Sequence, residues 1–123
     1  MYVIGAPHPL KDVAGPMLER VLREQERLVT NAEVLQEILH RYTSIRRREA
    51  IPVAFELVLD IVDTVFPIEL QDMEEARRIL LDSEDLSARD SLHYAIMRRY
   101  EIGRIMSFDG DFDGLPGIER ISS

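Results

Sequence analysis

Four acidic side chains are placed by the sequence near one edge of a predicted sheet. Glu37 lies in the second turn of a predicted helix that follows a strand. Asp90 lies in the first turn of the helix leading into a strand over 104–107, and Asp109 and Asp111 follow that strand. Carboxyl ends of parallel strands, and the N-termini of the helices between them, share one edge of a sheet. Carboxylates gathered there repel each other unless a cation neutralises them, which predicts a Mg²⁺ or Mn²⁺ site.

Each acid also has an ordinary structural explanation. Glu37 can pair with Arg41 one helical turn further on. Asp90 stands three positions after Ser87, so the two can form a capping box at a helix start. The aspartates of segment 109–114 alternate with glycines and are common turn formers. Their predicted convergence favours the metal site, but the sequence alone leaves both interpretations open.

Three further residues are candidate substrate contacts. His93 lies about one helical turn beyond Asp90, where it could touch a substrate or be buried in the core. Arg46 and Arg47 end a predicted helix, where basic side chains either contact phosphate or complement the helix dipole. A calcium loop is excluded. Segment 109–114 matches its D-x-D-x-D-G start, but Arg120 stands where the bidentate glutamate is required.

Composition excludes several classes of function. The chain has 23 acidic and 15 basic residues and a net charge of −8, which disfavours a general nucleic-acid coat protein. Lys11 is its single lysine and lies outside any glycine-rich loop, so phosphate-loop and lysine-base mechanisms are discarded. Cysteine is absent, which fits a reducing cytoplasm. No apolar run approaches the roughly 20 residues of a membrane span, so no membrane role is expected.

The hydrophobic pattern predicts one α/β domain over residues 1–123. Thr30 and Glu33 form a T-x-x-E signal for a helix start, and Pro52 suits the first position of the next helix. That second helix is apolar nearly all round, so burial on more than one side is expected. Helices are predicted over about 10–27, 31–45, 52–62, 72–81 and 87–102, and strands over 27–30, 64–68, 104–107 and 118–121. This alternation predicts a small, mostly parallel sheet covered by helices.

Three segments resemble the PIN-domain ribonucleases, especially VapC-type toxins: APHPLKDVA, VLQEILHRY and SARDSLHYAIMRRYEIGRIMSFDGDFDGLPGIERI. The resemblance implies a three-layer α/β/α fold and a metal-dependent endoribonuclease. It assigns Glu37, Asp90 and Asp109 to the metal, with Asp111 as a lesser ligand. It also implies an RNA substrate, a cognate antitoxin and a homodimer. The apolar helix faces over 18–22 and 53–62 favour such partners, and an antitoxin arginine could neutralise the acids as the metal would.

The N-terminus departs from that family pattern. The family opens with a strand ending in D-x-N, whereas Met1–Gly5 is interpreted as the start of the first helix. The strand and the first metal-binding aspartate are therefore expected to be missing, either through a misassigned start, which is favoured, or in an inactive relative. An active enzyme thus competes with an inactive PIN-like module that binds RNA or protein. A receiver-like domain ranks lower, since no lysine follows the fourth strand.

Overall fold

The computed structural model describes residues 2–4, 19, 23–25, 27–106 and 115–121. The strands are β1 (Tyr2–Ile4), β2 (Leu28–Asn31), β3 (Thr64–Phe66), β4 (Arg104–Met106) and β5 (Glu119–Ile121). The helices are α3 (Ala32–Ser44), α4 (Ile51–Ile61), α5 (Leu70–Asp82) and α6 (Ala88–Arg99), and a short 3₁₀ turn covers Arg48–Ala50. Most of the helix predicted over 10–27 lies outside the described residues. None of the described helices combines the length and the apolar composition that crossing a bilayer requires.

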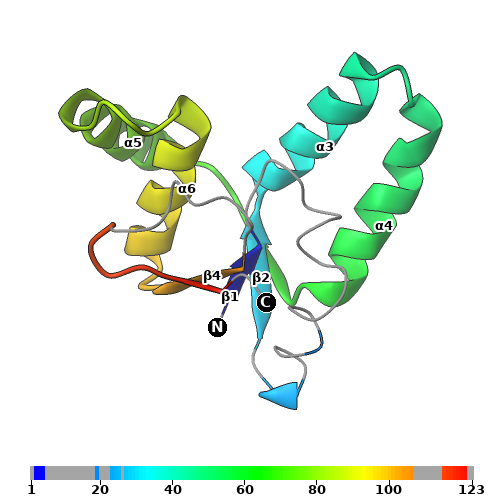
Figure 1. Cartoon of the computed structure of the whole chain (residues 1–123), viewed down its shortest axis with the longest axis horizontal. Coiled ribbons are helices and arrows are strands. Elements are labelled where there is room, and N and C mark those ends of the chain that lie inside the picture. The colour runs from blue at the N-terminus through cyan, green and yellow to red at the C-terminus, as the bar shows by residue number, and fades with distance from the viewer. Residues whose placement is uncertain (1, 5–18, 20–22, 26, 107–114, 122–123) are drawn as a thin grey trace.

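The five strands form one sheet in the order β3-β2-β1-β4-β5, and every one of these strand pairs is parallel. Helices α5 and α6 lie on one side of the sheet, and α3 and α4 extend from the other (Figure 1). This arrangement confirms the predicted α/β/α class. β3 is an edge strand, as the proline that follows it predicts, because proline cannot donate a hydrogen bond to a neighbouring strand.

The expectation that the first strand is missing is wrong. Tyr2–Ile4 forms β1, the central strand, with Tyr2 in register with both Leu28 and Arg104. The apolar run YVI is too short for its periodicity to distinguish a strand from a helix. Its β-branched and aromatic residues suit a strand, and pairing on both sides satisfies its backbone.

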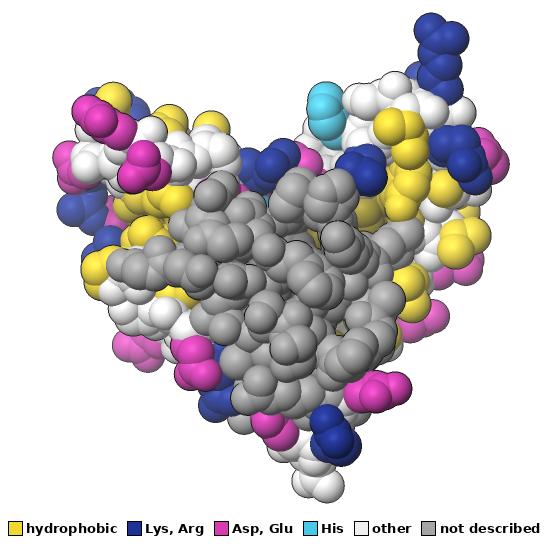
Figure 2. Space-filling model, in the orientation of Figure 1, with side chains coloured by type: hydrophobic (Ala, Val, Ile, Leu, Met, Phe, Trp, Pro, Cys, Tyr) yellow, Lys and Arg dark blue, Asp and Glu magenta, His cyan; other side chains and the backbone are white. Residues whose placement is uncertain are grey.

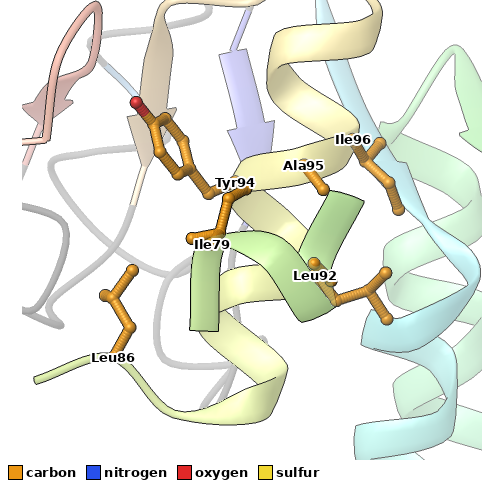
Figure 3. Close-up of a cluster of buried hydrophobic side chains, with 7 residues drawn as sticks. Ile79, Leu86, Leu92, Tyr94, Ala95 and Ile96 are labelled. Carbon is orange, nitrogen blue, oxygen red and sulfur yellow. The ribbon is translucent and has the colours of Figure 1, made fainter. Parts of the chain in front are cut away.

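Helix α6 is the centre of a hydrophobic cluster that covers one side of the sheet. Every residue from Asp90 to Met97 is buried, so this helix has no solvent-facing stripe along its middle. Its apolar side chains pack against α5 (Figure 3); the cluster comprises Ala76, Ile79, Leu86, Leu92, Tyr94, Ala95 and Ile96. Tyr94 also donates a hydrogen bond to the Pro116 carbonyl at 2.9 Å. A helix buried in this way holds the side chains of its first turn in fixed positions.

Helix α4 is much more exposed than its composition predicts. Ala54 and Val58 are buried, one turn apart, against α3. Val53, Leu57 and Leu59 are 65%, 39% and 47% exposed, so the expectation of burial on more than one side is wrong. One stripe suffices to pack α4 on α3, and nothing in the described part of the chain covers the rest. Figure 2 shows hydrophobic side chains on the surface of the arm that α3 and α4 form.

Candidate functional site

The carboxyl edge of the sheet brings the N-termini of α3 and α6 together. Helix α3 begins directly where β2 ends, and α6 leads into the amino end of β4, so its own N-terminus points to the same edge. The two helices are joined by a buried hydrogen bond of 2.9 Å between the side chains of Asn31 and His93. Residues 62 apart in sequence thereby fix the two helix starts against each other.

Asn31 uses both ends of its side-chain amide. Oδ1 accepts hydrogen bonds from the backbone N–H groups of Glu33 at 2.9 Å and Val34 at 3.3 Å, which caps α3. The predicted capping by Thr30 is therefore wrong, because α3 begins one residue later and Asn31, the last residue of β2, is its N-cap. Nδ2 is left to donate to His93. Sequence reasoning missed Asn31, although an asparagine between a strand and a helix is a recognised N-cap signal.

His93 is fully buried one turn beyond Asp90. Because the Asn31 amide nitrogen is a donor, His93 Nδ1 is the acceptor and Nε2 carries the proton. Burial, and secondarily the charge of Arg89, lower the pKa of His93 to about 4, so the ring is neutral. The exposed fraction of His93 is 0%, so the ring lies inside the core, where it is not accessible for the predicted substrate contact. Its hydrogen bond to Asn31 instead positions α3 relative to α6.

Glu37 lies in the second turn of α3 and is only 8% exposed. Arg89, in the first turn of α6, donates from Nη1 to Glu37 Oε2 at 2.8 Å. Glu37 is thus paired with Arg89, whereas its ordinary structural explanation was a pair with Arg41. A pairing between residues 52 apart cannot be read from helical spacing. Arg89 therefore escaped notice in the sequence.

Asp90 follows Arg89 in the first turn of α6 and is 1% exposed. Its backbone N–H donates to Ser87 Oγ at 3.1 Å, so Ser87 caps the helix as predicted. A buried carboxylate is costly unless a positive charge or several donors stabilise it. The start of α6 supplies some of this stabilisation through its dipole.

The electrostatics of this edge indicate crowded negative charge. Desolvation by burial raises the pKa of Glu33, and repulsion by Glu37 raises it further, while Arg89 opposes the shift. Buried carboxylate oxygens are hard donors, which fit a divalent cation such as Mg²⁺ or Mn²⁺. Within the described ranges, no three acidic or histidine side chains are arranged to hold a metal. A divalent cation at this edge would therefore take further ligands from elsewhere in the chain or from water.

Of the remaining predicted residues, the structure describes Arg46 and Arg47, and it does not bring them to this edge. Asp109 and Asp111 lie outside the described residues. They follow β4 in the sequence. Arg46 and Arg47 are exposed beyond the far end of α3, and Arg47 pairs with Glu49. At about 1.5 Å per residue, the end of α3 at Ser44 is about 10 Å from Glu37 along the helix axis.

Comparison with known proteins places this architecture in a family. The PIN domain model matches residues 1–118. A VapC ribonuclease of Mycobacterium bovis and ribonuclease VapC13 of Mycobacterium tuberculosis are each 55% identical over 122 residues, covering 99% of this chain and 93% of theirs. Ribonuclease VapC23 of M. tuberculosis is 38% identical over 109 residues, covering 89% and 86%. The chain therefore belongs to the PIN-domain family, within its VapC group.

Solved structures agree on the fold. The crystal structure of M. tuberculosis VapC20, a toxin described as cleaving the sarcin–ricin loop, superposes with a TM-score of 0.75 at 19% identity. The superposition covers 94% of this chain and 95% of VapC20. A toxin–antitoxin complex from Klebsiella pneumoniae gives a TM-score of 0.68 at 11% identity, covering 97% and 96%. At such identities the likeness concerns the fold alone.

Proposed function

We propose that this chain is the toxin of a toxin–antitoxin pair, an endoribonuclease that hydrolyses RNA phosphodiesters with Mg²⁺ or Mn²⁺. The observation that carries the proposal is the pair of buried acids, Glu37 and Asp90, on two helix starts that Asn31 and His93 lock together. The 55% identity to named ribonucleases over nearly the whole chain supports the same activity. Asp109 and Asp111 are assigned to the same cation because they directly follow β4 in the sequence.

In this proposal the protein prepares the site and the cation supplies the chemistry. A bound divalent ion activates water and stabilises charge on the phosphodiester in the transition state. Glu37 and Asp90 hold that ion, and the Asn31–His93 bond keeps their helices at a fixed separation. Figure 2 shows the molecule hollowed between its two helical arms, with basic and acidic side chains together where the arms meet. Arg46 and Arg47 would meet phosphates of a longer RNA, at the outer end of α3.

The alternative is an inactive PIN-like module that binds RNA or protein. One sequence observation favours it: residues 5–11, which follow β1, contain no Asp or Glu. The first acid of the family pattern thus has no counterpart directly after the central strand. An active enzyme therefore requires that Glu37, Asp90, Asp109 and Asp111 suffice to hold the cation.

Cleavage of RNA by the purified chain distinguishes the two functions. We expect hydrolysis of single-stranded RNA with Mg²⁺ or Mn²⁺ and its loss in EDTA, because the cation supplies the charge stabilisation. Restoration by added Mn²⁺ is the control for damage by the chelator. RNA binding without cleavage at any metal concentration would leave the inactive module as the function.

We propose an antitoxin and a second copy of the chain as partners, acting in the cytoplasm where RNA is present. The exposed apolar side chains of α4 are the surface for an apolar antitoxin helix, since contiguous apolar patches mark interaction sites. The hydrogen bond between Arg89 and Glu37 supports this proposal, because an antitoxin arginine would place the same group beside Glu37.

The α4 surface can be tested with one substitution. We expect Leu57→Glu to weaken antitoxin binding by about tenfold or more, because burying an unpaired carboxylate in an apolar contact is costly. Glu56→Gln, on an exposed neighbouring position, is the matched control. Calorimetry gives the affinity, and sedimentation velocity of the isolated chain gives the oligomeric state. Unchanged binding by Leu57→Glu would place the antitoxin elsewhere, and a strictly monomeric chain at micromolar concentration would exclude the homodimer.

A further inference from the structure

Arg89 already provides a positive charge where the proposed cation has to bind. Its guanidinium is 2.8 Å from Glu37, and both side chains are largely withdrawn from water, at 31% and 10% exposure. By contrast, the Arg78–Glu75 pair lies along one helix, with the arginine 62% exposed. The Arg89 bond joins two helices across the candidate site and is partly desolvated.

The Arg89 guanidinium is only partly satisfied in this position. Its Nε is buried and makes no hydrogen bond within the described structure. A buried donor without an acceptor costs free energy, which offsets part of the gain from the bond to Glu37. The hydrogen bond to Glu37 therefore holds the side chain, while the Nε donor is unsatisfied within the described structure. A competitor for Glu37 can displace the guanidinium.

Sequence adjacency makes simultaneous occupancy unfavourable. Arg89 and Asp90 are consecutive residues in the first turn of α6, and Arg89 reaches across to Glu37. A divalent ion shared by Glu37 and Asp90 would therefore stand within a few ångströms of the guanidinium, at a distance where like charges repel strongly in a partly buried site. Arginine cannot relieve this by losing its proton.

We propose that Arg89 and the divalent cation compete for Glu37, so that Arg89 stabilises the metal-free site and sets the affinity for the metal. This inference depends on the proposed metal site. Without metal, the guanidinium neutralises Glu37 and joins α3 to α6. With metal, Arg89 releases Glu37 and turns toward solvent between the two helical arms, where its charge is available to an RNA phosphate.

The test is a calorimetric titration of the full chain with Mn²⁺ alone, which measures the affinity for the metal. We expect Arg89→Gln to bind Mn²⁺ about tenfold more tightly than the parent chain, because a charged hydrogen bond no longer has to be broken. In EDTA the same variant should melt at a lower temperature, so its metal-induced rise in Tm should be larger. Arg77→Gln, the same change at an exposed position of α5, should alter neither quantity.

Arg89→Lys keeps the charge but loses the planar guanidinium, so we expect an intermediate gain in Mn²⁺ affinity of about threefold. This variant also serves if Arg89→Gln fails to fold without metal. Equal or weaker Mn²⁺ binding by folded Arg89 variants, with the parent chain binding normally, would overturn the competition and leave the proposed enzyme intact. A parent chain and variants that all fail to bind Mn²⁺ would overturn the metal site itself.

Discussion

Replacement of Glu37 by glutamine is expected to reduce RNA cleavage by about 10²-fold or more while the chain stays folded. The amide is the same size as the carboxylate but carries no charge, so it is a poor ligand for a hard divalent cation. Glu37 is 8% exposed and already accepts a bond from Arg89, so the substitution changes charge at a defined position. Initial rates at saturating Mn²⁺ and the Mn²⁺ affinity from calorimetry are the two measurements.

Glu74→Gln is the matched control, since Glu74 is exposed on α5 and the change in net charge is identical. It should cleave RNA at the parental rate. Melting temperatures in EDTA separate loss of chemistry from loss of fold, because Glu37→Gln also weakens the contact with Arg89. A Glu37→Gln chain with parental activity and parental Mn²⁺ affinity would remove Glu37 from the site.

Local patterns predicted most of the elements of the fold. The strands before α3 and after α6 were expected within one or two residues, and Ser87 caps α6 as its spacing indicates. These features depend on neighbours in sequence. β1 was misassigned because a three-residue strand owes its stability to pairing on both sides and not to its own pattern. The exposure of α4 was equally unpredictable, because composition does not say which apolar side chains find a partner.

The candidate site shows the same division between local and long-range information. Glu37 and Asp90 were recognised because their places after a strand and at a helix start are local properties. The Asn31–His93 and Arg89–Glu37 contacts join residues 62 and 52 apart, and only the folded chain shows them. The pattern thus indicated where the acids lie, but not what neutralises them or what holds their helices together. Asp109 and Asp111 stay predictions.

Replacement of Asn31 by alanine is expected to lower the free energy of unfolding by about 3 kcal/mol, the sum of a lost helix cap and a buried acceptor left without its donor. Asn31 is 1% exposed, so water cannot replace either contact. Ser87→Ala is the matched control, because it removes the cap of α6 without touching the link between the helices.

Ser87→Ala should cost only about 1 kcal/mol, the usual value for a single N-cap. Urea unfolding of both variants, monitored by circular dichroism, measures the difference between their free energies of unfolding. The excess cost of Asn31→Ala reports the bond to His93, which keeps the helix of Glu37 beside the helix of Asp90. For the same reason Asn31→Ala should weaken Mn²⁺ binding, whereas Ser87→Ala should affect it less. If the two variants unfold with equal cost, the link between α3 and α6 adds nothing to stability, and the site must be held by packing alone.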